Sequence, residues 1–285
     1  MIDFQNTSKQ YGRTVAIDNL SLTIAEDGIY ILLGRNGAGK TTLMKLIAGH
    51  IGATGGSIAV DGKQVSPGRM PECVNFVESN SEQFNMRVSE LIEAAGTVQD
   101  GFDLAFAHRM AGKFALDPHK RYKQLSFGMK TMLTTILTLA NRSKIILLDE
   151  PVLGFDAIMR DQFNTLLLES YEAYPRIIIV STHLIDEIAK VAQRLIVIEK
   201  GKCLLSTDIN DIDEHAYALT GPANTVAPLL ENRNCIGQDK IGGMLVAYIY
   251  GERVPPQEGV TTDRLSLQDF FIKLVGEETH HESFQ

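Results

Sequence analysis

The sequence predicts an α/β fold built on a buried sheet, followed by a smaller α/β appendage. Up to about residue 200, short apolar runs typical of strands alternate with amphipathic stretches typical of helices. A glycine-rich loop joins one of these strands to a helix, and the character of the chain changes after about residue 211. With 285 residues, 44% hydrophobic and 22% charged, the chain can form a large domain with a substantial core and one smaller unit.

The charge balance limits the possible partners. Lys and Arg number 27 against 35 Asp and Glu, which gives a net charge of −8. Because binding to phosphate backbones needs clustered cations, we expect no nucleic-acid partner and no purely electrostatic adhesion to anionic lipid. The N-terminus lacks a secretory pattern, and no apolar run approaches the roughly 18 residues that span a bilayer. We therefore expect a soluble chain that reaches a membrane only through a partner.

The three cysteines indicate a reducing compartment. Cys73, Cys203 and Cys235 are odd in number and widely spaced, which does not fit a disulfide framework. The sequence has no CxxC-like pair of the kind that binds zinc. We therefore expect the three cysteines to be small, buried, apolar side chains.

Periodicity locates the main elements of the first domain. A strand is expected at residues 29–33, and the helix after it stops at Gly49. Continuous apolar runs at 145–148 and 177–180 are typical of strands buried on both faces. Ser126 is placed to cap a helix that runs to Ala140, with its methionines in the core.

The rest of the chain predicts three further parts. Residues from about 85 to 125 are helical in pattern, which suggests a helical subdomain inserted into a larger α/β domain at 1–212. Residues 213–276 form the expected accessory domain, with a strand at 244–250 and a helix opened by Ser266. The polar tail at 277–285, which contains His280 and His281, is expected to be disordered.

A glycine-rich segment follows the strand at 29–33. It reads Gly34-Arg35-Asn36-Gly37-Ala38-Gly39-Lys40-Thr41 and fits the pattern G-x-x-x-x-G-K-[ST]. Its glycines let the backbone turn tightly and point N–H groups at phosphate oxygens, and the helix N-terminus adds partial positive charge. Lys40 is expected to reach the β- and γ-phosphates, and the Thr41 hydroxyl to ligate Mg²⁺. We call residues 34–41 the phosphate loop and expect it to bind ATP.

Two carboxylates end the strand expected at 145–148. Asp149 and Glu150 stand at the carboxyl end of a buried strand, where open α/β sheets bind ligands. Asp149 is expected to hold the Mg²⁺ shell, and Glu150 to polarise the attacking water as a general base. Together with the phosphate loop upstream, these carboxylates predict an ATP-hydrolysing site.

The order of the motifs resembles one family, the ATP-binding cassettes, over roughly residues 2–210. The further segments that carry the resemblance are Tyr11 in Ser8-Lys9-Gln10-Tyr11-Gly12, the signature segment Leu125-Ser126-Phe127-Gly128-Met129, Gly154-Phe155-Asp156-Ala157, and His183 in Ser181-Thr182-His183. Taken singly, Tyr11 would be a packing residue, Ser126 a helix cap and His183 a histidine at a strand end. As a set they are similar to a P-loop nucleotide-binding domain with an inserted helical subdomain.

The resemblance implies a role for each matching residue. Tyr11 stacks on adenine, the loop with Asp156 touches an opposite subunit, and His183 contacts the γ-phosphate. Ser126 and Gly128 cap the γ-phosphate held by the other subunit, so that two ATPs lie between two subunits. The full expected set is Tyr11, Gly34, Arg35, Asn36, Gly37, Ala38, Gly39, Lys40, Thr41, Thr42, Ser126, Gly128 and Asp156 for the nucleotide, Thr41, Asp149 and Glu78 for the metal, and Glu150 and His183 for catalysis.

Two positions depart from the family pattern. The family usually has a glutamine after the strand near residues 74–77, where this chain has Glu78 or Ser79, with Gln83 misregistered nearby. Glu78 is the residue there that can bind metal through water. The signature segment has Phe127 and Met129 where the family usually has glycine and glutamine, although Ser126 and Gly128 are kept.

The resemblance also implies the partners. These are polytopic membrane transporter subunits and a second ATP-binding subunit, which would hold the chain at the cytoplasmic face of the cell membrane. Met129-Lys130 and the appendage resemble bacterial exporters of drugs, antibiotic peptides or lipids. The alternatives are a soluble cassette ATPase acting on ribosomes or DNA, and an ATP-gated regulatory subunit with low turnover.

Overall fold

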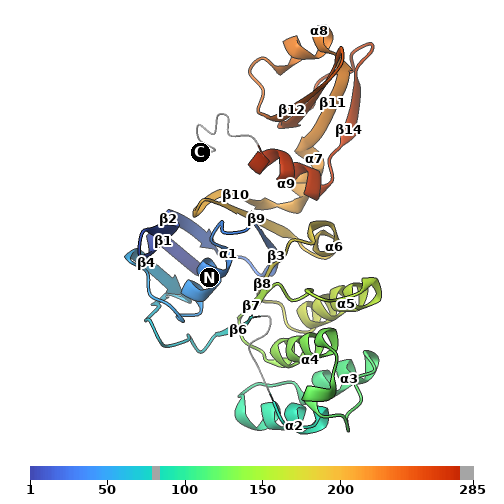
Figure 1. Ribbon diagram of the computed structural model, residues 1–285. Helices are drawn as coiled ribbons and strands as arrows, with labels where there is room; N and C mark the ends of the chain where they lie inside the picture. Colours follow the sequence, from blue (N-terminus) through green and yellow to red (C-terminus); the bar gives the residue numbers. More distant parts are fainter. Residues whose placement is uncertain (79–83, 277–285) are drawn as a thin grey trace.

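The computed structural model describes residues 1–78 and 84–276, in which a six-stranded sheet forms the centre (Figure 1). The strand order is β10-β9-β3-β8-β7-β6, and all neighbours are parallel except β10, which is antiparallel to β9. The strands are β3 (Gly28–Leu33), β6 (Val74–Glu78), β7 (Ile145–Asp149), β8 (Ile177–Ser181), β9 (Arg194–Glu199) and β10 (Lys202–Asp208). The strands expected at 29–33, 145–148 and 177–180 are thus confirmed as β3, β7 and β8.

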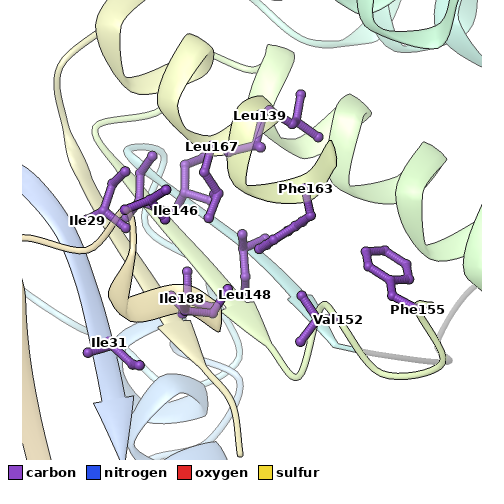
Figure 2. Packing of buried hydrophobic residues seen from close by; sticks show 14 of the residues in the cluster. Ile29, Ile31, Leu139, Ile146, Leu148, Val152, Phe155, Phe163, Leu167 and Ile188 are labelled. Carbon is purple, nitrogen blue, oxygen red and sulfur yellow. The ribbon is translucent and has the colours of Figure 1, made fainter. Parts of the chain in front are cut away.

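Both faces of this sheet are covered, because successive side chains of a strand point to opposite sides. Ile29 and Ile31 belong to the core formed with α4 (Phe127–Ala140), α5 (Ala157–Ala173) and α6 (Ile185–Ala189). Tyr30 and Leu32 instead pack with α1 (Lys40–Ile47) and a second sheet. Figure 2 shows the first of these cores, with Ile146 and Leu148 of the sheet facing Phe163 and Leu167 of α5.

The second sheet is antiparallel, in the order β2-β1-β4-β5, and the sequence analysis did not identify it. Its strands are β1 (Ile2–Tyr11), β2 (Thr14–Ile24), β4 (Gly55–Val60) and β5 (Lys63–Gln64). Asn6 and Asn19 have φ of +47°, and the β1–β2 register shifts between Phe4 and Thr7. Such bulges interrupt the alternation of buried and exposed residues, which is the signal that identifies a half-buried strand.

Helices follow β6 as the sequence predicts. They are α2 (Val88–Val98), α3 (Leu104–Lys113) and the 3-10 helix η1 (Tyr122–Gln124), which precede α4. Ser126 is confirmed as the N-cap of α4, since its hydroxyl accepts a hydrogen bond from the Met129 N–H at 3.2 Å. None of the helices within residues 1–78 and 84–276 is long and apolar enough to cross a bilayer.

The C-terminal part forms a third sheet, in the order β12-β13-β11-β14, reached through α7 (Ile209–His215). Its elements are β11 (Ala216–Pro222), α8 (Ala223–Val226), η2 (Ala227–Leu230), β12 (Cys235–Ile241), β13 (Met244–Tyr250), β14 (Thr261–Arg264) and α9 (Leu267–Gly276). The strand at 244–250 and the helix opened by Ser266 are confirmed, the latter by a 3.0 Å hydrogen bond from the Asp269 N–H to the Ser266 hydroxyl.

The C-terminal part packs against the main domain. Phe270 and Leu274 belong to the same hydrophobic cluster as Ile188 of α6, so the appendage shares a core with the main domain. The tail at 277–285, with His280 and His281, lies outside the described residues.

The prediction that all three cysteines are buried is wrong. Cys73, Cys203 and Cys235 are free thiols, each partly exposed at the margin of a hydrophobic cluster. Burial raises the pKa of the Cys203 thiol to about 11. That thiol therefore stays protonated at neutral pH.

A buried arginine holds the C-terminal end of α4. Arg176, 2% exposed, donates hydrogen bonds to the carbonyl oxygens of Leu139 and Asn141 and to the Ser170 hydroxyl. Burial lowers its pKa to about 10, which leaves the guanidinium charged at neutral pH. The last carbonyls of a helix lack partners within that helix and carry partial negative charge, which this guanidinium satisfies.

We expect Arg176→Met to destabilise the protein by about 2–4 kcal/mol, because it removes the hydrogen bonds that the guanidinium donates to the carbonyl groups of Leu139 and Asn141. The free energy of unfolding in urea measures this loss. Arg142→Met is the matched control, because Arg142 is exposed and pairs with Asp103 at 3.1 Å at the surface. It should cost less than about 1 kcal/mol, and equal losses in both variants would contradict the role given to Arg176.

Candidate nucleotide-binding site

The phosphate loop lies between β3 and α1 and depends on left-handed glycines. Gly37 and Gly39 have φ of +83° and +113°. A Cβ on Gly39 would lie 2.5 Å from the carbonyl oxygen of Ala16, so the space as well as the backbone requires glycine there. No side chain caps α1, and its first turn has no acidic residue. Its N-terminal N–H groups are therefore suited to an anion.

Lys40 lies along this loop among acidic groups. Its ammonium donates hydrogen bonds to the carbonyl oxygen of Gly34 at 2.6 Å and to that of Arg35 at 3.3 Å. Burial lowers the pKa of Lys40, and the nearby charges of Glu150, Asp149 and Glu199 partly oppose that shift. The ammonium is thus partly desolvated, and an incoming anion would stabilise its charge.

Thr41 and Asp149 meet across the site. The Thr41 hydroxyl, in the first turn of α1, donates a 2.7 Å hydrogen bond to the carboxylate of Asp149 at the end of β7. Within the described part of the chain, no group of three or more His, Cys, Asp or Glu side chains could hold a metal. One hydroxyl and one carboxylate fit Mg²⁺, because this ion commonly takes its other ligands from water and substrate phosphates.

Glu150 and His183 form the second contact at this edge. The Nδ1 atom of His183 lies 2.9 Å from the Glu150 carboxylate, and the Glu150 N–H donates to the carbonyl oxygen of Ser181 at 2.9 Å. Glu150 has a φ of +50°, which is unusual for a residue other than glycine and costs of order 1 kcal/mol. Val152 and Phe155, both buried and visible in Figure 2, anchor the turn after it. The core thus holds Glu150 in a strained conformation that directs it to this edge.

Glu78 has a partner that the sequence analysis missed. Its carboxylate lies 2.6 Å from the ammonium of Lys45, and both side chains are about one-third exposed. Lys45 stands four residues after Thr41 on α1, a spacing that places both on one helix face but does not predict the contact with Glu78. Ser79 and Gln83 lie outside the described residues.

Tyr11 lies at the end of β1 with its ring exposed. The relative exposure of the residue is 47%, and the Lys9 ammonium lies 5.0 Å from the ring centroid. The ring is therefore accessible to a stacking partner.

Ser126 and Asp156 cap two neighbouring helices. Ser126 begins α4, and the Asp156 carboxylate begins α5 by accepting a 2.8 Å hydrogen bond from the Met159 N–H. These helices pack on the face of the sheet opposite to α1 (Figure 1). The structure thus brings Lys40, Thr41, Asp149, Glu150 and His183 to one edge, whereas Ser126 and Asp156 open helices on the other face.

Phe127 lies over the turn that leads to α5. A Cβ on Gly154, which has a φ of +80°, would lie 2.5 Å from the Phe127 ring, and a Cβ on Gly128 would lie 3.0 Å from the Met159 sulfur. Phe127 itself is 41% exposed. The signature segment and the turn at 151–156 are therefore in direct contact within one chain.

The fold and the phosphate loop together define a nucleotide-binding α/β protein of the P-loop class. The family model described as ABC transporter matches residues 17–153. The taurine import ATP-binding protein TauB of Escherichia coli (strain K12) is 32% identical over 206 residues, which cover 70% of this chain and 80% of TauB. The chain belongs to the ABC transporter ATP-binding family, whose cassettes hydrolyse ATP.

Other relatives point the same way. The ABC transporter ATP-binding protein YtrB of Bacillus subtilis (strain 168) is 29% identical, over 75% of this chain and 73% of YtrB. The lantibiotic transport ATP-binding protein SrtF of Streptococcus pyogenes is also 29% identical, over 73% of this chain and 91% of SrtF. A solved dimeric ATP-binding cassette, bound to ADP and Pi after hydrolysis, superimposes with a TM-score of 0.62 at 21% identity, over 73% of this chain and 99% of that one. At that identity the likeness shows the fold.

The contact between Phe127 and Gly154 predicts a coupled pair of substitutions. We expect Gly154→Ala to destabilise the protein by about 2–4 kcal/mol, the sum of left-handed strain and overpacking against the ring. Adding Phe127→Ala should reduce the cost of Gly154→Ala to the strain alone, about 1 kcal/mol, as measured in a double-mutant cycle of unfolding free energies. Gly62→Ala is the control, since its φ is +74° and nothing lies within 4 Å of its Cβ. Strict additivity of the two substitutions would contradict the proposed contact.

Proposed function

We propose that the chain is the ATP-hydrolysing subunit of a transporter and drives a separate membrane subunit through ATP-dependent closure of a dimer. The observation that carries this proposal is the meeting of Lys40, Thr41, Asp149, Glu150 and His183 at one edge of the sheet. Family membership supplies ATP as the ligand. The geometry supports a role for each side chain.

The edge can bind a triphosphate and activate water with its own groups. The N–H groups of the phosphate loop and the Lys40 ammonium would hold the phosphates. Thr41 and Asp149 would hold Mg²⁺, which supplies neutralisation of phosphate charge when bound. Glu150 would accept a proton from the attacking water, and His183, in contact with Glu150, would orient that carboxylate and reach the terminal phosphate.

The remaining site residues are proposed to act with the nucleotide base or across the dimer. The exposed ring of Tyr11 would stack on adenine. Ser126 and Gly128, at the start of α4, would face the phosphates bound by a second copy or a related subunit. Asp156, at the start of the neighbouring helix, would touch that same subunit. Each ATP would thus be bound by residues of two chains.

A groove between β6, α2 and α4 is proposed to receive the membrane subunit. Its volume is about 300 Å³, and its apolar lining includes Phe76, Val77, Phe84, Met86, Val98 and Leu137. Val98 is 82% exposed, which is unusual for a valine on a packed helix. A short apolar segment of a membrane protein suits such a lining. This arrangement would place the chain on the inner face of the cell membrane.

The proposed division of the chain follows from these roles. Residues 1–212 would form the ATPase domain, and about 85–125 within them a helical subdomain that contacts the membrane subunit. Residues 213–276 would form an accessory domain that steadies α6 and α7 through its shared core.

Export is the direction we favour. The Met129-Lys130 continuation of the signature segment resembles exporters of drugs, antibiotic peptides or lipids, and SrtF is named for lantibiotic transport. TauB, named for taurine import, is similar over less of its length, 80% against 91% for SrtF.

Turnover against protein concentration tests the ATPase proposal. We expect the rate per subunit to rise with concentration, because each site needs groups from two chains. Glu150→Gln should lower this rate by about 10²–10⁴-fold, since the amide cannot act as a base, while ATP binding is kept and a dimer accumulates. Steady-state phosphate release and light scattering measure both effects.

Two control variants accompany this experiment. Glu172→Gln changes an exposed carboxylate of α5 and should leave turnover as in the wild type. Lys40→Ala should lose most ATP affinity. If wild type and Glu150→Gln turn over equally slowly, the chain is instead an ATP-gated regulatory subunit.

The groove predicts a docking defect. We expect Val98→Asp to weaken co-purification with a polytopic membrane subunit about tenfold, because it places a charge in an apolar contact. Val15→Asp is the matched control, an exposed valine of β2 outside the groove. Equal losses in the two variants would remove the groove from its proposed role.

A further inference from the structure

Two contacts, rather than one, join the helix of the phosphate loop to the acidic edge of the sheet. The first is the hydrogen bond from Thr41 to Asp149, at 2.7 Å. The second is the ion pair of Lys45 with Glu78, at 2.6 Å. Glu78 and Asp149 are paired in register on the parallel strands β6 and β7. Because Lys45 follows Thr41 by one helical turn, the two contacts run side by side from helix to sheet edge.

Lys45 faces the nucleotide edge and not the core. The buried residues of α1 are Leu43, Met44, Leu46 and Ile47, whereas Lys45 is partly exposed. The pKa of Lys45 is raised, first by its hydrogen bond with Glu78 and further by the negative charges of Glu78 and Asp149. The ammonium of Lys45 is therefore stabilised by the carboxylates at this edge.

The pair matters because of the charges around it. Three carboxylates lie at the edge that is proposed to bind a polyanion, those of Glu78, Asp149 and Glu150. An uncompensated carboxylate there repels phosphates and attracts divalent cations. A lysine bonded to that carboxylate cancels both effects.

We propose that Lys45 is a positioning residue that neutralises Glu78 and thereby sets how strongly nucleotide binding depends on a divalent cation. The inference rests on the proposed function, since it concerns ATP as the ligand. It assigns Glu78 a role through its partner on α1.

A merely structural ion pair would behave differently. Partly exposed pairs contribute little to stability, so removing one would shift the unfolding midpoint slightly in the same direction for either partner. It would leave unchanged the ratio of ATP affinity in Mg²⁺ to ATP affinity in EDTA. That ratio, measured by calorimetry on the full chain, separates the two roles without depending on turnover.

The experiment compares Lys45→Met, Glu78→Gln and the double variant, each in the Glu150→Gln background so that ATP stays intact. Lys45→Met removes the ammonium that is bonded to Glu78. The negative charge of Glu78 should then weaken the binding of ATP in EDTA about fivefold, which is the size of effect that one unit charge has in a largely aqueous site. Binding in Mg²⁺ should weaken less, so the affinity ratio rises. In Glu78→Gln the ratio should fall, and in the double variant it should return to within about twofold of the parent.

Two further variants complete the design. Lys45→Arg keeps the charge and should keep the parent ratio. Lys144→Met breaks a similar exposed pair, Lys144 with Asp61 at 2.8 Å, and is the matched control that should leave the ratio unchanged.

The outcomes separate the inference from the function on which it rests. Opposite shifts of the ratio in the two single variants, cancelled in the double variant, support the inference. An unchanged ratio with normal ATP binding overturns it and leaves the proposed function intact. Failure of the parent protein to bind ATP in either condition overturns the proposed function itself.

Discussion

The hydrogen bond between Thr41 and Asp149 is the contact on which the arrangement of the site depends. It joins two elements 108 residues apart in sequence, the first turn of α1 and the end of β7. Since Lys40 precedes Thr41 and Glu150 follows Asp149, this contact joins the two segments that carry those side chains. The glycines of the phosphate loop allow it, because only a left-handed residue without a Cβ fits beside Ala16 at position 39.

A second constraint couples the two halves of the proposed dimeric site within one chain. Glu150 is held in a left-handed conformation by a turn whose apolar residues, Val152 and Phe155, are buried. The same turn passes under the ring of Phe127 at Gly154 and ends at Asp156. A shift of Glu150 would therefore press on the start of α4 through rigid contacts over a few residues, and a shift at α4 would act on Glu150 in return.

Local patterns predicted β3, β7 and β8 of the six-stranded central sheet, together with candidate residues at its carboxyl edge. The phosphate loop, the Asp149-Glu150 pair and the cap by Ser126 were all legible because each depends on neighbours in sequence. The β1–β2 hairpin was not, because the bulges at Asn6 and Asn19 break its alternation. The pairing of Lys45 with Glu78 depends on β6 lying beside β7, a spatial order that no local pattern contains. For the same reason the clash that makes glycine necessary at 154 appears only in three dimensions.

An acidic chain can bind a polyanion because binding depends on the local field and not on the net charge of −8. The two lysines of the edge differ in how they contribute to that field. Burial lowers the pKa of Lys40, which means that its charge is incompletely compensated and gains most when phosphate arrives. The pKa of Lys45 is raised by its bond with Glu78, so its charge is already satisfied. Lys40 is thus suited to respond to the ligand, and Lys45 to neutralise the carboxylate of Glu78.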